Sequence, residues 1–155
     1  MTNRYTRAST VQDALIAGFV GTTVEALVAR LTSGGSPGVV PVVAPSQMAK
    51  ALTRRYFDKS LTDGQASVVG MAMRWTYGPS WGVVATLIMD LKPRMSVMRG
   101  GAILGATIWA FELAALPATG ATPPLSKWGA RAILGDGAQA CAFGFTVAAC
   151  HRVRN

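Results

Sequence analysis

The sequence predicts an all-α polytopic membrane protein with four transmembrane helices and one short amphipathic interfacial helix in the first loop. Of its 155 residues, 50% are hydrophobic and only 14% are charged, whereas soluble domains carry roughly 25% charged residues. Apolar runs of membrane-spanning length alternate with turn residues, and Lys and Arg flank these runs. We therefore expect one four-helix transmembrane domain over residues 1–155.

The first span is expected over about residues 11–31, because roughly 20 apolar residues cross a bilayer core of about 30 Å. Thr10 is the expected N-cap, with Asp13 three residues later in a capping-box-like arrangement. Glycine, serine and proline over 33–38 favour a turn after this span. Asp13 and Glu25 interrupt the apolar run, so we interpret it as an uncleaved helix and not as a secretory signal.

A short helix over about 46–59 is too charged to span and is expected to lie on the membrane surface. Met48, Leu52 and Tyr56 fall at spacings that place them on one face. The alternative is a solvated helix packed on the ends of the bundle. In the surface interpretation, three basic residues contact anionic lipid headgroups: Lys50, Arg54 and Arg55.

The other spans are expected over about 66–91, 95–116 and 126–153. Pro79 should kink the second span, because proline removes a backbone hydrogen bond. Two small-xxx-small pairs predict close helix packing, because glycine lets backbones approach each other. The four residues are Gly78, Gly82, Gly101 and Gly105.

The distribution of basic residues favours cytoplasmic N- and C-termini. The tails and the second connection carry seven basic residues: Arg4, Arg7, Lys92, Arg94, Arg99, Arg152 and Arg154. Near the third connection stand only Lys127 and Arg131. The longer first connection lies on the same side as the third. Its basic residues make the numbers on the two sides equal: Arg30, Lys50, Arg54, Arg55 and Lys59.

Several ionisable residues fall inside or near the spans, where an unpaired charge costs several kcal/mol. Counted from the helix ends, Glu25 and Arg74 lie roughly 9 and 12 Å deep, so they are level. Arg74 is expected to bind both Glu25 and Glu112, because guanidinium can bind two carboxylates. The predicted cluster comprises Glu25, Arg74, Glu112, Arg131 and Asp136. It could be a buried brace, a proton or solute pathway, or a set of side chains reaching separately to headgroups.

The residue pattern offers little for catalysis or metal binding. His151 has no ligand-spaced partner, and Ser80 has no histidine base in its span, so neither an enzyme, a metal site nor a cofactor is expected. Cys141 and Cys150 lie about 13 Å apart along one helix and cannot pair within it. The net charge of +8 is spread over helix ends, so nucleic acid is not an expected partner.

The latter half of the chain resembles a known family. Residues 75–82 (WTYGPSWG), the glycines Gly101 and Gly105, Trp109, Glu112 and the Leu116-Pro117 pair before a Pro-Pro turn resemble the YagU-like bacterial inner-membrane proteins. This resemblance implies a plasma-membrane bundle without established catalysis.

The expected function is that of a non-catalytic integral membrane protein. It would be an accessory or structural subunit of a larger membrane complex, or a homo-oligomeric bundle. The alternative is a small proton-coupled or solute transporter or channel subunit that uses intramembrane carboxylates. A third possibility is lipid recognition by the basic loop helix. The expected partners are membrane lipids and other membrane subunits or further copies of the chain.

Overall fold

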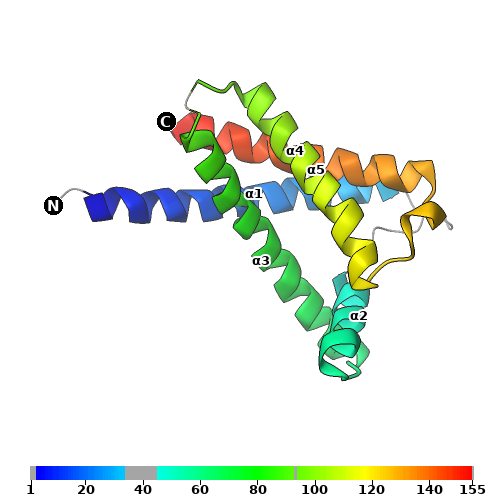
Figure 1. Ribbon diagram of the computed structural model, residues 1–155. Helices are drawn as coiled ribbons and strands as arrows, with labels where there is room; N and C mark the ends of the chain where they lie inside the picture. Colours follow the sequence, from blue (N-terminus) through cyan, green and yellow to red (C-terminus); the bar gives the residue numbers. More distant parts are fainter. Residues whose placement is uncertain (1–2, 34–44, 93, 155) are drawn as a thin grey trace.

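A computed structural model describes the backbone of residues 3–33, 45–92 and 94–154 (Figure 1). Within these ranges the chain is all-helical, with no strand, as the sequence predicts. The elements are α1 (Asn3–Ser33), α2 (Pro45–Phe57), α3 (Asp63–Asp90), α4 (Val97–Thr119), the 3₁₀ turn η1 (Leu125–Lys127) and α5 (Ala130–Arg154). The turn expected over 33–38 lies, from residue 34 on, outside the described residues, as do the side chains of Arg4 and Arg7.

The four long helices pack in the spatial order α3, α1, α5, α4, so the central pair comes from opposite ends of the chain. Each packed pair is antiparallel. Gly78 and Gly82 of α3 face Thr22 and Ala14 of α1 in reversed order, and Gly101 and Gly105 of α4 likewise face Phe145 and Cys141 of α5. The consecutive helices α3 and α4 therefore occupy the two outer positions, and α2 packs on the N-terminal part of α3 (Figure 1).

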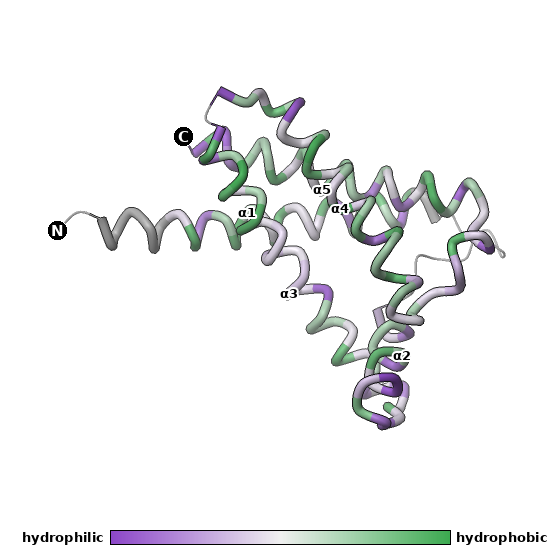
Figure 2. The backbone as a smooth tube through the Cα atoms, in the orientation of Figure 1, coloured by the Kyte–Doolittle hydropathy of each residue, from purple (hydrophilic) through white to green (hydrophobic). Residues whose placement is uncertain are grey.

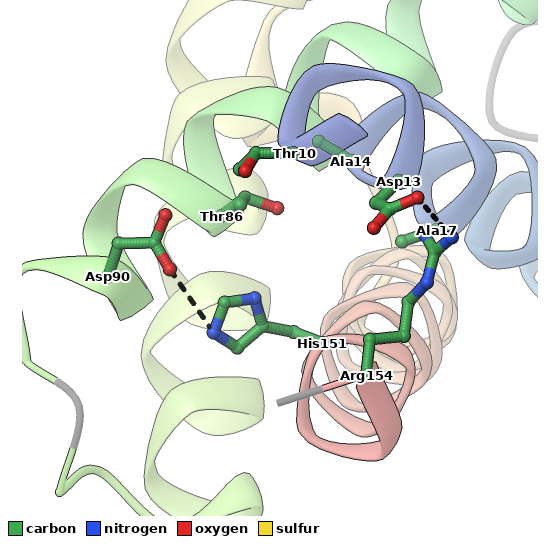
Figure 3. Close-up of a pocket in the computed structure, with 8 residues that line it drawn as sticks. All are labelled: Thr10, Asp13, Ala14, Ala17, Thr86, Asp90, His151 and Arg154. Atoms are coloured by element: carbon green, nitrogen blue, oxygen red, sulfur yellow. Dashed lines mark ion pairs between the residues drawn. The ribbon is translucent and has the colours of Figure 1, made fainter. Parts of the chain in front are cut away.

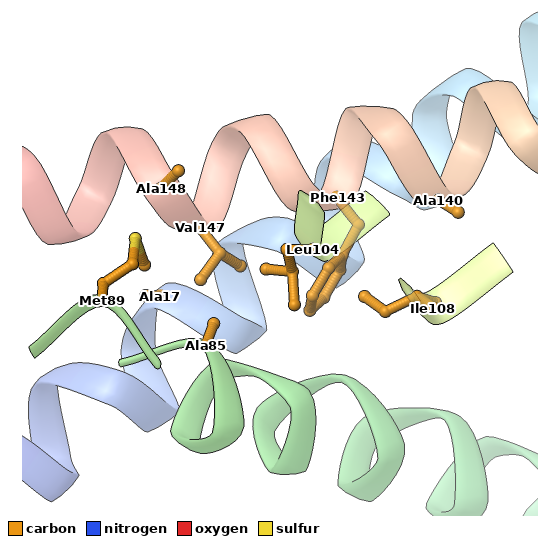
Figure 4. Close-up of a cluster of buried hydrophobic side chains, with 9 residues drawn as sticks. All are labelled: Ala17, Ala85, Met89, Leu104, Ile108, Ala140, Phe143, Val147 and Ala148. Carbon is orange, nitrogen blue, oxygen red and sulfur yellow. The ribbon is translucent and has the colours of Figure 1, made fainter. Parts of the chain in front are cut away.

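A small apolar core lies where α1, α3, α4 and α5 meet (Figure 4). Val147 of α5 is fully buried and lies near the middle of this core, between side chains of the other helices. Alanines supply much of the rest, which lets the backbones approach closely. The core residues are Ala17, Ala85, Met89, Leu104, Ile108, Ala140, Phe143, Val147 and Ala148.

The predicted packing glycines lie at helix–helix contacts within the chain. A Cβ added at Gly82 would come 2.8 Å from the Cα of Gly18, and one at Gly105 would come 2.8 Å from the Cα of Cys141. Gly78 packs against the side chain of Thr22, and Gly101 against Phe145. Because both pairs are used inside one chain, they give no argument for self-association.

Several helix ends differ from the sequence expectation. Thr10 is not an N-cap, because α1 already begins at Asn3. A capping box that the sequence reading missed starts α3: Thr62 accepts from the backbone of Gln65, whose side chain accepts from the backbone of Thr62. Helix α4 continues through Pro117 and ends at Gly120, whose φ of 72° is left-handed backbone that favours glycine.

Helix α2 packs on α3, with Ala49 buried in the contact. This arrangement matches the alternative of a helix packed on the bundle more closely than that of a helix lying free on a surface. Two of its three expected headgroup residues have contacts within the chain. Lys50 forms an ion pair with Asp63, and the guanidinium of Arg55 lies 5.9 Å from the ring centre of Tyr56. Arg54 is exposed.

Three helices among the described residues are long and apolar enough to cross a membrane: Thr10–Leu31, Val97–Thr119 and Ala130–Arg154. No more than about a third of the residues in each apolar window is buried inside the molecule. Helix α3 is long enough, with 28 residues, but Arg74 and its polar neighbours interrupt its apolar sequence. Figure 2 shows this as pale and purple segments in the middle of α3.

Candidate functional site

A polar cavity with about 40 Å³ of space lies among α1, α3, α4 and α5. A buried water needs roughly 10–15 Å³, so the cavity has room for about three water molecules. Three carboxyl groups line it, one each from α1, α4 and α5, together with an amide and three aromatic rings. The polar and aromatic lining residues are Glu25, Tyr77, Trp81, Glu112, Asp136, Gln139 and Phe143.

The first carboxylate, Glu25 of α1, forms an ion pair with Arg74 of α3. Its Oε1 lies 3.6 Å from Nη2 of Arg74, and both side chains are 30% exposed. Antiparallel packing of α1 on α3 brings these two residues level, as depth counting along the helices predicts. Within the described part of the chain, this is the ion pair that Arg74 forms.

The second carboxylate, Glu112 of α4, lines the same cavity. It accepts a hydrogen bond from the hydroxyl of Tyr77 on α3, with 3.2 Å between the oxygens. Trp81 packs edge-on against Phe111 of α4 at 5.7 Å between ring centres. These two contacts join the outer helices α3 and α4 beside the cavity. The expectation that Arg74 is shared with Glu112 is not met, because the partner of Glu112 is Tyr77.

The third carboxylate, Asp136 of α5, is the most buried ionisable group described. Asp136 is only 2% exposed, and its Oδ2 has no hydrogen-bond partner among the described residues. Gln139 and Phe143 follow it by three and seven residues, so the three share one helix face and line the cavity together. A buried acceptor without a donor is costly and calls for a ligand, a water or a proton.

Arg131 does not belong to this cluster. It is exposed and does not line the cavity. The physical reason is angular: five residues separate it from Asp136, which is about 140° around an α-helix, so the two residues point in different directions. Depth along the helix was enough to pair Glu25 with Arg74. It does not show in which direction around its helix Arg131 points.

A second polar cavity, of about 80 Å³, lies where the first half of α1 meets the ends of α3 and α5 (Figure 3). Asp13 forms an ion pair with Arg154, and Oδ1 of Asp90 lies 3.6 Å from Nε2 of His151. In Figure 3 the side chains of Asp90 and His151 point toward each other across the cavity, and the Asp13–Arg154 pair lies beside them. These contacts join α1, α3 and α5.

Sequence reasoning missed both Tyr77 and this end cluster, although signals existed. Tyr77 and Trp81 follow Arg74 by three and seven residues, which places them on its helix face. Asp13 near the start of the first span and Arg154 near the end of the last belong to the same side of a four-span topology. Depth counting applied to the ends of the helices would have paired them.

No protein-family model, curated protein or solved structure matches the chain. The site must therefore be interpreted from its chemistry. Within the described residues, no group of three or more His, Cys, Asp or Glu side chains is arranged to hold a metal ion. The cavity offers an excess of hydrogen-bond acceptors and negative charge, and this combination is suited to a proton or a small cation that donates hydrogen bonds.

Proposed function

We propose that the chain is a four-span integral membrane protein, with α3 as the fourth span, and that it serves as a non-catalytic subunit of a membrane assembly. Three apolar helices carry most of their spanning residues on the outside of the molecule. A surface of that kind needs lipid or other membrane subunits around it. The resemblance to YagU-like inner-membrane proteins supports the same location and remains part of the proposal.

The direction of the helices carries the argument for α3 as a span. Helix α5 is antiparallel to both α1 and α4. If α1 crosses the membrane in one direction, α4 must cross it in the same direction. The chain must therefore return between them, and α3 is the long helix available. Its 28 residues extend over about 42 Å, enough for a crossing.

Reporter fusions test this topology. An enzyme active only outside the cytoplasm, fused after Asn155 or after Lys92, should stay inactive if both sites are cytoplasmic, as we propose. The same reporter fused after Lys127 should be active. Three spans without α3 would put the C-terminus and the start of α1 on opposite sides, so activity of the Asn155 fusion together with a cytoplasmic N-terminus would contradict the proposal.

Isolation in a mild detergent tests the role as a subunit. We expect the chain to elute with further copies or with other membrane proteins, because its small core leaves most of its apolar helix surface outside. Treatment with a harsher detergent should release it as a monomer. A lone monomer in the mild detergent, without any co-purifying protein, would argue against this role.

A second candidate function is a small proton- or cation-coupled transport component. It is favoured by one observation, the buried acceptor of Asp136 in a cavity that three carboxyl groups line. Proton or solute flux into liposomes should then fall when Glu25, Glu112 and Asp136 are all neutralised to amides. Flux that is unchanged in this triple variant would dismiss transport through the cavity.

A further inference from the structure

We propose that the carboxyl-lined cavity among α1, α3, α4 and α5 binds one small cation that carries N–H donors, such as an ammonium ion or a primary alkylammonium ion. The inference rests on the proposed membrane location of the bundle, because low polarity around the cavity makes its charge imbalance costly. It adds a ligand class that neither a structural brace nor a proton pathway requires.

Charge balance is the first step. Arg74 offsets Glu25, and within the described residues no cationic side chain forms an ion pair with Glu112 or Asp136. Tyr77 donates one hydrogen bond to Glu112 but carries no charge. Two carboxyl groups in one half-buried cavity repel each other when both are ionised. A cation between them removes this repulsion.

Hydrogen bonding is the second step and selects the class of cation. Oδ2 of Asp136 is buried and has no donor among the residues described. A primary ammonium group has three N–H donors in diverging directions, so it can bond to carboxylates on different helices. A quaternary ammonium ion has no N–H group and would leave this oxygen without a donor.

The arrangement and size of the cavity are the third step. Its acidic groups do not converge closely enough to hold a metal ion, as judged over the described residues. The rings of Tyr77, Trp81 and Phe143 line the same space, and aromatic faces attract organic cations. About 40 Å³ of space suits a cation of one or a few heavy atoms. Tyr77 is 37% exposed, so this wall of the cavity borders the outside of the bundle.

Isothermal titration calorimetry on the purified full chain in lipid nanodiscs tests the proposal. Methylammonium chloride should bind saturably at one site, while sodium chloride and tetramethylammonium chloride at the same ionic strength should not. Asp136→Asn and Glu112→Gln should each weaken methylammonium binding by about tenfold or more, since each removes a charge-assisted hydrogen bond. Asp90→Asn is the matched control and should leave binding unchanged, because Asp90 lies in the other cavity.

Three results would overturn the proposal: no saturable methylammonium binding by the folded wild-type chain, equal binding of sodium, or full affinity in Asp136→Asn. Circular dichroism of each variant checks that it is folded, and Glu112→Gln gives a second variant on another helix. The topology fusions do not depend on the ligand. If the fusions show the expected topology but methylammonium does not bind, the cation site alone is rejected. If methylammonium binds but the fusions show another topology, the four-span bundle is rejected.

Discussion

At the scale of single residues, the molecule combines very close backbone packing with a few polar side chains that have specific partners. Gly18 of α1 illustrates the first feature, since a Cβ there would lie 2.5 Å from the Cα of Pro79. Backbone cannot move aside as a flexible side chain can. Arg74 and Glu25 illustrate the second feature, because each offsets the charge of the other where both side chains are largely buried.

Replacing Gly18 with alanine should destabilise the bundle. The new methyl group must push α1 and α3 apart, and overpacking of this kind costs about 1–3 kcal/mol. Thermal unfolding in detergent, followed by circular dichroism, should show a lower Tm. Gly135→Ala is the matched control, because a Cβ at Gly135 has no neighbour within 4 Å. Equal Tm values for the two variants would mean that α1 and α3 are not in backbone contact.

The Arg74–Glu25 pair should show strong coupling in a double-mutant cycle. Arg74→Met leaves a carboxylate without its cation, and such an orphan costs about 1–3 kcal/mol or more. Arg74→Met with Glu25→Gln removes both charges and should recover most of that loss. Free energies of unfolding for the two single variants and the double variant check this. Additive losses would show that the two side chains do not interact.

At the scale of elements, α3 is the unusual helix. It is polar in its middle, starts with a capping box at Thr62 and contains Pro79 where it packs on α1. Its N-terminal part holds α2 through the buried Ala49 and the Lys50–Asp63 ion pair. Helix α3 therefore connects the four-helix bundle to α2, which is too short to span a membrane.

The docking of α2 should depend on pH in the acid range. The hydrogen bond and charge of Lys50 hold the pKa of Asp63 below its usual value of 3.8. A carboxyl group with a lowered pKa stabilises the folded arrangement above its usual pKa, and this contribution disappears as the pH falls through the lowered value. The protection factors of α2 backbone amides, which correct hydrogen exchange for its intrinsic dependence on pH, should therefore fall in acid. In Asp63→Asn this pH dependence should be absent, and an identical acid response in the variant would assign it to other groups.

At the scale of the whole molecule, the order α3, α1, α5, α4 makes the first and last helices the centre of the bundle. The Asp13–Arg154 ion pair joins the first half of α1 to the end of α5, and the contact between Asp90 and His151 joins the ends of α3 and α5. Near the middle, the outer helices meet across the carboxyl-lined cavity through Tyr77 and Glu112.

Exchanging the charges of Asp13 and Arg154 should test the antiparallel central pair. Asp13→Arg or Arg154→Asp alone places like charges side by side and should lower Tm. The double exchange restores opposite charges and should recover it. The side chains are 37% and 36% exposed, so we expect an effect of about 1 kcal/mol or less for the lost attraction. If Tm did not recover in the double variant, Asp13 and Arg154 would not be neighbours.

The all-helical fold and most helix positions follow from the sequence, because apolar runs with turn residues between them leave few alternatives. Local rules also located the packing glycines. The sequence does not determine which helices these glycines join. Gly78 and Gly82 pack on α1, and Gly101 and Gly105 on α5, yet the same pattern would suit contacts between chains. Lipid-facing and protein-facing apolar surfaces have the same composition, so only the packed structure distinguishes them.

The candidate site, too, could be predicted only in part from the sequence. Distance along a helix axis is set by residue number, so the sequence by itself could bring Glu25 level with Arg74. The angle between two residues around a helix axis also follows from residue number, but which direction faces the cavity depends on the neighbour that the helix packs against. This packing left Arg131 outside the cavity and placed Glu112 beside Tyr77. The buried, unpaired Asp136 oxygen arises only when four helices close around it. The sequence determined that charges enter the apolar spans, and the tertiary structure decided which of them share a cavity.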